Sequence, residues 1–174
     1  MPDFRASKTH QLVTLAILVA LDVIFTRFLS VNTPILRIGF GFLPVVVCAI
    51  LYGPWKAGAA HAIGDVIGAV LFPSGAFFPG FTLSAFLGGV IYGLFFYQKR
   101  LTPLRVLAAC AVIMLVLNLG LGSLWISMLY GKSYLALVSV RIVKELIAIP
   151  IYMVTILFLD KTVIVALRSS RAFQ

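Results

Sequence analysis

The chain has 174 residues, of which 62% are hydrophobic and 11% are charged, whereas soluble domains average about 25% charged residues. This composition indicates an integral membrane protein, and the length allows at most about six spans of about 20 residues each, which excludes a globular catalytic unit. The net charge of +9 does not indicate nucleic-acid binding, because the basic residues are dispersed and lie mostly at segment ends, as cytoplasmic loops of membrane proteins require.

Hydropathy and helix breakers predict six helices, taken here in chain order. The spans cover residues 10–29, 37–51, 55–72, 81–97, 106–126 and 137–159. Pro44 predicts a kink in the second span, because proline cannot donate a helical hydrogen bond. The first apolar run has no small-residue cleavage site directly after it, so we interpret it as a retained span. Cys48 and Cys110 fall in apolar runs and are interpreted as small buried side chains. We therefore expect a single all-α integral membrane domain over residues 1–174.

The distribution of basic residues predicts how the six helices cross the membrane. A cytoplasmic N-terminus puts both termini on the inner side, with nine basic residues inside and five outside, in agreement with the positive-inside rule. The positive-inside rule does not account for the five basic residues on the outer side, and they suggest an outward-facing basic cavity for an anionic solute. The alternative is that each side chain snorkels to lipid headgroups. The five are Arg27, Arg37, Lys132, Arg141 and Lys144.

Ionisable residues interrupt three of the apolar segments. Arg141, Lys144 and Glu145 lie at spacings i, i+3 and i+4, so in a helix the three side chains share one face. Charged groups inside a membrane span are costly and usually mark a polar site within the protein. We therefore expect this face to bind a polar group. The remaining interruptions are Asp22, Arg27 and Asp65.

Two polar patterns suggest contacts with a ligand. Asp65 follows His61 by four residues, so the two side chains can reach each other, and Asp65 is expected either to bind a ligand or to tie the structure together. Asn118, Gly122 and Trp125 share a face of the fifth helix. An amide and an indole suit a planar heteroaromatic ring, although Trp125 could equally pack against apolar neighbours. No nucleophile stands at a fixed spacing from His61, and we expect neither a catalytic residue nor a metal site.

Small residues recur at four-residue spacing on two helices. Ala16 and Ala20 form one pair, and Ala60, Gly64 and Gly68 form a longer stripe. Small side chains let helix backbones approach closely in a membrane. The stripes therefore predict either packing inside the bundle or a docking face for another membrane subunit.

Several strings in the chain resemble a known family. They are RIGFGFLP at 37–44, YGP at 52–54, GD at 64–65, FPSGAFFPGFT at 72–82 and YG at 92–93. Together they are similar to the substrate-binding S components of energy-coupling factor (ECF) vitamin transporters, and the string at 72–82 looks like the folate-specific branch. The resemblance implies a six-helix bundle in the bacterial plasma membrane, with a vitamin site near the outer face. It also implies a transmembrane coupling subunit and two cytoplasmic ATPases, which use ATP while this subunit needs no cofactor.

Folate agrees with the residues noted above, because its flat pterin ring has a donor edge that a carboxylate can match and its glutamate tail is anionic. Under the resemblance we assign the pterin edge to Asp65 or Asn118 and the ring contacts to Trp125 and Phe40. The ligand's acceptor atoms or tail are assigned to Arg37, Arg141 and Lys144.

In the same family a small-residue face on the first helix meets the coupling subunit, and Ala16 and Ala20 match it. We extend this expected interface to Ala60 and Gly64. Arg27 is a further substrate-binding candidate, although on an ideal helix it projects only about 20° from Ala20, so one face would have to serve both purposes.

Three other functions remain open at this point. The nearest is an S component for riboflavin or a deazapurine. A membrane-embedded enzyme acting on lipid headgroups would need clustered His, Asp or Glu side chains, and only His61 and Asp65 qualify. A structural assembly subunit would leave the five outer cations unexplained.

Overall fold

The computed structural model describes residues 8–32, 37–73 and 75–164. The helices are α1 (Lys8–Arg27), α2 (Phe42–Tyr52), α3 (Pro54–Leu71), α4 (Pro79–Phe96), α5 (Pro103–Val112), α6 (Gly122–Tyr130) and α7 (Tyr134–Leu159). Two stretches are π-helical: η1 (Ile113–Leu121), which joins α5 to α6, and η2 (Asp160–Ile164), which follows α7. Strands β1 (Ser30–Asn32) and β2 (Arg37–Gly39) pair antiparallel.

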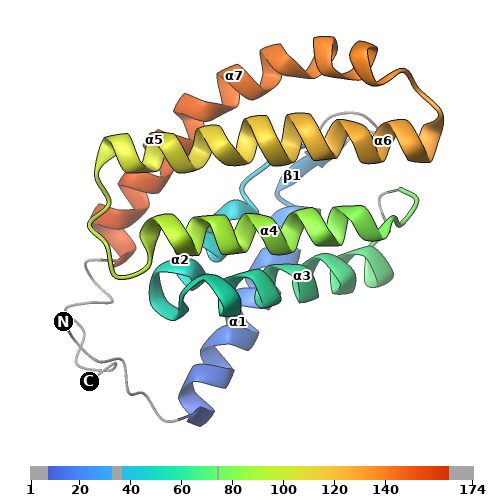
Figure 1. The fold of residues 1–174 in the computed structure, drawn as a ribbon. Coiled ribbons are helices and arrows are strands. Elements are labelled where there is room, and N and C mark those ends of the chain that lie inside the picture. Colours follow the sequence, from blue (N-terminus) through green and yellow to red (C-terminus); the bar gives the residue numbers. More distant parts are fainter. Residues whose placement is uncertain (1–7, 33–36, 74, 165–174) are drawn as a thin grey trace.

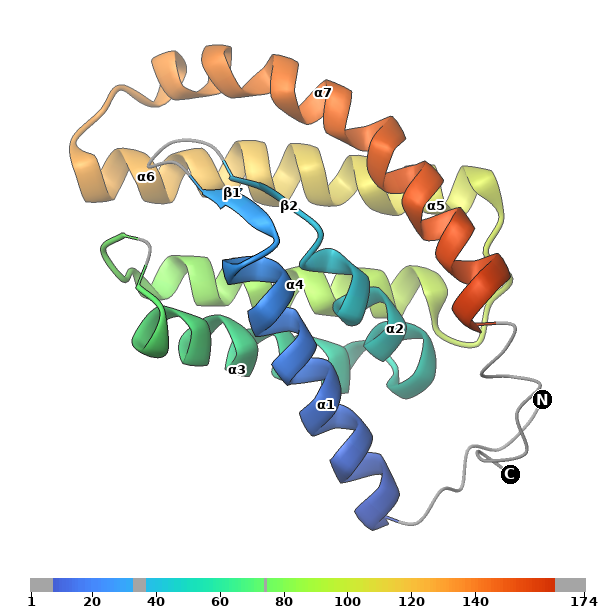
Figure 2. The same ribbon diagram turned by 180° about the vertical axis from the view of Figure 1, so that it is seen from behind.

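The long helices lie side by side with alternating directions (Figures 1 and 2). The continuous helix 103–130, formed by α5, η1 and α6, lies between α7 and α4, and α3 packs against α4 on the other side. Helix α1 crosses this layer obliquely, and the short α2 lies beside it. The connections after α3 and after α6 lie at one end of the bundle, and the α2–α3 and α4–α5 connections lie at the other.

Glycines allow α3 and α4 to pack closely. A Cβ at Gly89 would lie 2.6 Å from the backbone oxygen of Ala57, and one at Gly93 would overlap the backbone of Pro54. Gly53 separates α2 from α3 with a φ of 83°, a backbone conformation that favours glycine. Pro54 then begins α3, where its fixed φ suits a first helical turn. This tight turn falls in the gap between the predicted spans 37–51 and 55–72.

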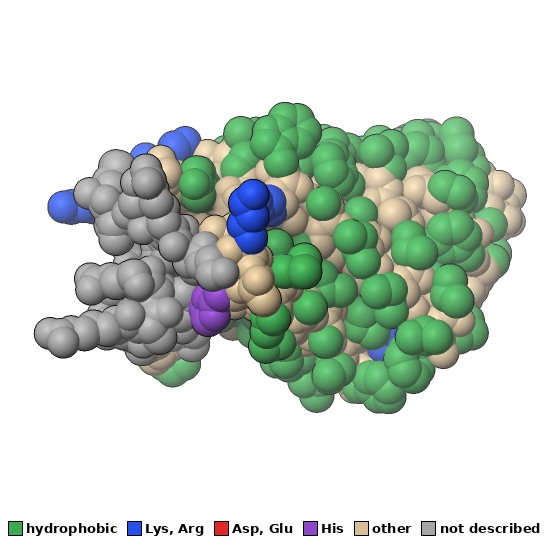
Figure 3. Space-filling view, turned by 90° about the horizontal axis from the view of Figure 1, so that it is seen from below, with side chains coloured by type: hydrophobic (Ala, Val, Ile, Leu, Met, Phe, Trp, Pro, Cys, Tyr) green, Lys and Arg blue, Asp and Glu red, His purple; other side chains and the backbone are tan. Residues whose placement is uncertain are grey.

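The surface of the bundle is apolar, as expected for a protein surrounded by lipid. Figure 3 shows hydrophobic side chains over the face on the α1 and α3 side, with most of the visible Lys and Arg side chains toward one end. Four helices in the described part of the chain are long and apolar enough to cross a membrane: Lys8–Arg27, Pro79–Phe96, Pro103–Tyr130 and Tyr134–Thr162. The other two predicted spans correspond to α2, which has 11 residues, and to α3, which carries Lys56, His61 and Asp65.

The segment before α2 departs from the sequence prediction. Residues 37–51 were expected to be a helix, but β1 and β2 form a hairpin and α2 begins only at Phe42. Gly39 and Gly41 explain the late start, because glycine is a poor helix former. A Cβ at Gly39 would overlap the side chain of Ser30, its partner in the ladder. The described part of the fold is therefore helical with one pair of three-residue strands and is not purely α.

The core is built around α2, whose residues are nearly all buried. Val46, Ala49 and Phe96 are among its fully enclosed side chains. Cys48 and Cys110 are free and buried in the same cluster, which confirms their interpretation as small core residues. Pro44 lies in the first turn of α2, where it costs no helical hydrogen bond, so the kink predicted at this residue has no cause.

Candidate functional site

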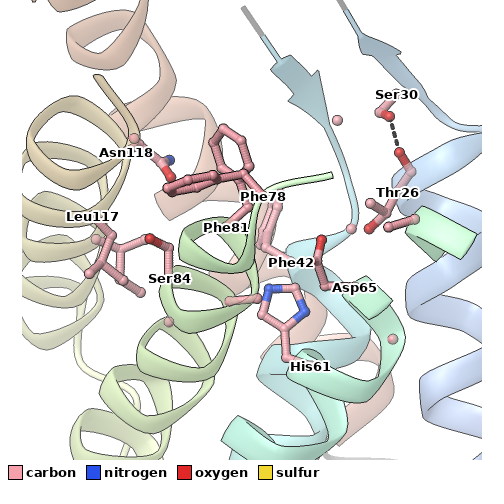
Figure 4. A pocket seen from close by; sticks show the side chains of 18 of the residues that line it. Thr26, Ser30, Phe42, His61, Asp65, Phe78, Phe81, Ser84, Leu117 and Asn118 are labelled. Carbon is pink, nitrogen blue, oxygen red and sulfur yellow. Dashed lines mark hydrogen bonds between the residues drawn. The ribbon is translucent and has the colours of Figure 1, made fainter. Parts of the chain in front are cut away.

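A cavity of about 340 Å³ opens between α1, α3, α4, the helix 103–130, α7 and the hairpin. Figure 4 shows Asn118 and Leu117 on one side of it and Thr26 and Ser30 on the opposite side. Ser30 Oγ donates a hydrogen bond to the Thr26 backbone oxygen at the end of α1. The cavity therefore lies inside the bundle, surrounded by residues from both halves of the chain.

One polar cluster lies where α1 crosses α3. Asp22 is 3% exposed, its Oδ1 accepts a hydrogen bond from Thr26 Oγ1 at 3.1 Å, and its Oδ2 lies 2.7 Å from His61 Nδ1. The sequence had suggested that His61 could bond to Asp65. The structure instead brings Asp22 of α1 to the imidazole, because the absence of a side chain at Gly64 lets α1 approach: a Cβ at Gly64 would lie 2.6 Å from Asp22 Oδ2.

Asp65 belongs to a second cluster that joins α1, α3 and α4. Its Oδ2 accepts a hydrogen bond from Thr82 Oγ1 at 2.8 Å, and its Oδ1 lies 4.0 Å from Arg27 Nη2. Arg27 also donates to the Asp65 backbone oxygen at 3.5 Å. Both Arg27 and Asp65 line the cavity. Arg27 is the last residue of α1, so its long side chain reaches inward while Ala20, two turns earlier, stays exposed.

The charged residues of α7 form a third cluster, on the side of the cavity opposite α1 and α3. Arg141 and Lys144 line it, and Arg141 Nη1 donates to Ser123 Oγ at 3.1 Å. Lys144 Nζ donates to Glu145 Oε1 at 2.8 Å. The sequence prediction that the three side chains share one helix face is confirmed. Two cations therefore face the cavity from α7, while carboxylates and Arg27 face it from α1 and α3.

Asn118 and three phenylalanines line the cavity between these clusters. Asn118 Nδ2 donates to Met114 Sδ at 3.2 Å, and a thioether is a weak acceptor. Phe42, Phe78 and Phe81 also line the cavity. A flat ring placed here would have aromatic faces to stack on and an amide to hydrogen-bond.

Trp125 and Phe40 do not line the cavity, although the sequence assigned ring contacts to both. Trp125 Nε1 donates to Ser84 Oγ at 2.9 Å, and its ring packs 5.6 Å from Phe78. The π-helical turns before it bond i to i+5, which shifts the helix face, so that Ile126 lines the cavity from the next position.

Phe40 misses the cavity for a different reason. It lies between β2 and α2 and is 47% exposed. Phe42 stacks on Tyr152 with ring centroids 4.0 Å apart and takes the place at the cavity wall. Tyr152 also donates to the Gly39 backbone oxygen at 3.0 Å. Arg37 is part of β2, and its side chain lies outside the described residues.

The predicted small-residue interface divides into two environments. Ala16 and Ala20 are exposed on α1, facing away from the bundle. Gly64 is buried and contacts Asp22, and Ala60 packs against the core. Gly64 and Ala60 thus serve contacts within the chain, since α1 and α2 occupy the space beside them.

Sequence reasoning had not assigned several cavity residues. Asp22 was noted only as an interruption, and Thr26 was not singled out, yet the two lie four residues apart in the apolar half of α1, a spacing that places them on one face. Tyr130 and Tyr152 also line the cavity; nothing in their surroundings in the sequence distinguishes them from other membrane tyrosines.

Residues 10–159 match the model of the family described as "ECF transporter, substrate-specific component". The chain belongs to this family of membrane transport subunits.

The chain is similar to proteins that carry the name FolT. It is 47% identical over 149 residues to the folate transporter FolT of Clostridium novyi (strain NT), covering 86% of this chain and 87% of that one. It is 36% identical over 177 residues to the folate transporter FolT of Leuconostoc mesenteroides subsp. mesenteroides, covering 98% and 95%. A crystal structure of FolT bound with folic acid superposes with a TM-score of 0.84 at 37% identity, covering 90% of this chain and 94% of that chain.

Proposed function

We propose that the chain is the folate-binding membrane subunit of an ECF-type transporter. The observation that carries this proposal is the match in sequence and fold to FolT bound with folic acid over 90% of the chain, together with an internal cavity lined by aromatic rings and by charges of both signs. The 47% identity to the folate transporter of C. novyi supports the same ligand.

The cavity offers groups for both ends of folate. Asp65 and Asn118 are the proposed partners of the pterin edge. Asp65 keeps acceptor capacity beyond its bond from Thr82, since a carboxylate has about four lone-pair sites. Arg141 and Lys144 are proposed to bind the anionic tail or other acceptor atoms. The rings of Phe42, Phe78 and Phe81 replace Trp125 and Phe40 as the proposed stacking surfaces. Arg27 and Arg37 remain candidates for the ligand's acceptor atoms.

The proposal includes a membrane topology. Helices α1, α2, α3, α4, 103–130 and α7 would be the six spans, with both termini in the cytoplasm. The alternating directions of the long helices support this arrangement. So do Lys56, Lys99 and Arg100, which lie at or next to the α2–α3 and α4–α5 connections, because basic residues concentrate on the cytoplasmic side. The chain would then reside in the bacterial plasma membrane.

Transport would require other subunits. We propose that the exposed pair Ala16 and Ala20 on α1 meets a transmembrane coupling subunit, which in turn engages two cytoplasmic ATPases. Small side chains on a lipid-facing helix permit close approach of a second helix. This chain would bind the vitamin without ATP and without a cofactor of its own.

Calorimetry on the detergent-solubilised chain tests the proposed ligand. Folate should bind with one-to-one stoichiometry in the absence of ATP, and riboflavin should give no signal at the same concentrations. Tight riboflavin binding without folate binding would replace the proposal with an S component of another specificity.

A further inference from the structure

Glu145 is an unusual residue in the α7 cluster, because it is completely buried and yet does not line the cavity. Its exposed fraction is 0%, and one carboxylate oxygen, Oε1, accepts from Lys144 Nζ at 2.8 Å. The other oxygen, Oε2, has no hydrogen-bond partner among the described residues. Its neighbours on the same helix face, Arg141, which is 6% exposed, and Lys144, do line the cavity.

A buried carboxylate with a free oxygen is costly for the fold. Structure alone gives little reason for it, since replacing a buried ion pair by apolar groups is often neutral or stabilising. The Glu145 carboxylate does affect the site, because its negative charge cancels one of the two positive charges that Arg141 and Lys144 bring to this wall of the cavity. Arg141, Lys144 and Glu145 together carry a net charge of +1.

We propose that Glu145 is a specificity-determining residue, which matches the α7 wall of the cavity to a single ligand carboxylate by cancelling one of its two positive charges. This inference rests on the proposed function, in which Arg141 and Lys144 receive the folate tail. The tail has two carboxylates, so the wall favours one and gains little from the second.

The test compares two ligands that differ by one charge at nearly constant shape. They are folate and the analogue in which an amide replaces its terminal tail carboxylate. Calorimetry gives the dissociation constant of each, and the quantity of interest is the preference for folate, the dissociation constant of the amide divided by that of folate. If the wild-type chain binds neither ligand, the proposed function fails. If it binds folate, only the preference among variants tests the role of Glu145.

Glu145→Gln keeps the size of the side chain and raises the net charge of the cluster to +2. The preference for folate should rise roughly tenfold, the effect expected of one unit charge about 10 Å away at an effective dielectric constant near 20. Lys144→Gln lowers the net charge to zero, and the preference should fall. The double variant Lys144→Gln/Glu145→Gln returns the cluster to +1, so its preference should return to the wild-type value even if both affinities are weaker.

A control separates local charge from total charge. Asp160→Asn in η2 removes one negative charge outside the cavity wall and should leave the preference unchanged. Should Glu145→Gln fail to fold, Lys144→Gln and the double variant still decide the matter. A preference that stays constant within about twofold, or one that shifts furthest in the double variant, would overturn the inference and make Glu145 a purely structural partner of Lys144.

Discussion

His61 Nδ1 lies 2.7 Å from Asp22 Oδ2, and this contact joins α3 to α1 at the level of Gly64. Both side chains line the cavity, and Asp22 is nearly enclosed by protein. The contact thus helps to hold together the two helices that form one wall of the proposed folate site.

Loss of this contact should lower the stability of the bundle. A hydrogen bond to a charged group contributes about 1.5–3 kcal/mol to stability. Asp22→Asn removes the charge from such a buried hydrogen bond, so the melting temperature of the detergent-solubilised protein should fall. Adding His61→Gln to Asp22→Asn should cost little more, because the two residues act as a pair. Strictly additive losses in the double variant would show that the two side chains stabilise the protein independently.

Gly64 provides a second prediction, on the packing of α1 against α3. Gly64→Leu places atoms where Asp22 Oδ2 already lies, and overpacking of this kind costs about 1–3 kcal/mol. Melting temperature and folate affinity should both fall. Ala59→Leu, on the exposed side of the same helix, is the control and should change neither. If Gly64→Leu instead binds folate normally and fails only to assemble with the coupling subunit, Gly64 belongs to the subunit interface after all.

The exposed pair on α1 leads to a prediction about assembly. Ala16→Trp, Ala20→Trp and the double variant should leave folate affinity and melting temperature nearly intact, because neither side chain is buried in the isolated chain. Co-purification with the coupling subunit and ATPases should weaken, and folate uptake into reconstituted vesicles should be lost. Val143→Trp, exposed on α7, controls for adding a bulky residue to the surface. A loss of affinity and stability together, with assembly preserved, would contradict the docking role.

Two cations near the same end of the bundle should differ in their effect on binding. Arg141 is buried and lines the cavity, whereas Lys132 is exposed in the connection before α7. Arg141→Ala should weaken folate binding roughly 10- to 150-fold, the equivalent of one lost charged hydrogen bond. Lys132→Ala should have little effect. Equal or reversed losses in titration calorimetry would move the anion site out of the cavity and into the connection.

Phe42 and Phe40 offer a matched pair for the aromatic wall. Phe42→Ala removes a buried ring that stacks on Tyr152, a change that typically costs about 3–5 kcal/mol in a core, so melting temperature and folate affinity should both drop. Phe40→Ala removes a half-exposed ring outside the cavity and should change both much less. A stronger effect of Phe40 on affinity would restore the ring contact assigned to it from sequence.

The helices were predictable because the membrane limits the choices. Apolar runs of the required length, ended by Gly and Pro as at Gly53–Pro54, give the spans of α1, α3, α4, 103–130 and α7 to within a few residues. The hairpin before α2 was not predictable, since strands of three residues are too short to show a period of two. Its ladder depends on Gly39 meeting Ser30, a contact between segments that a local pattern does not contain.

The charged residues that line the cavity could be predicted from the sequence, whereas the contacts between them could be predicted less well. Asp65, Asn118, Arg141 and Lys144 all line it, because a polar group retained in an apolar span has few places to lie other than the interior. The contact between His61 and Asp22 could not be read from spacing along α3, since Asp22 comes from another helix.

The helix 103–130 also makes the cavity sensitive to chain length. The stretch Ile113–Leu121 is π-helical, and each π-helical turn is wider and contains more residues than an α-helical turn. A one-residue deletion there can be absorbed by a return to regular α-helical bonding, which would keep the residues after it near their present faces. The same deletion in the first turn of α6 has no such compensation and would rotate everything downstream by about 100°. Ile126 and Tyr130, which line the cavity, would then turn away from it. Family members should therefore vary in length more readily within Ile113–Leu121 than within α6.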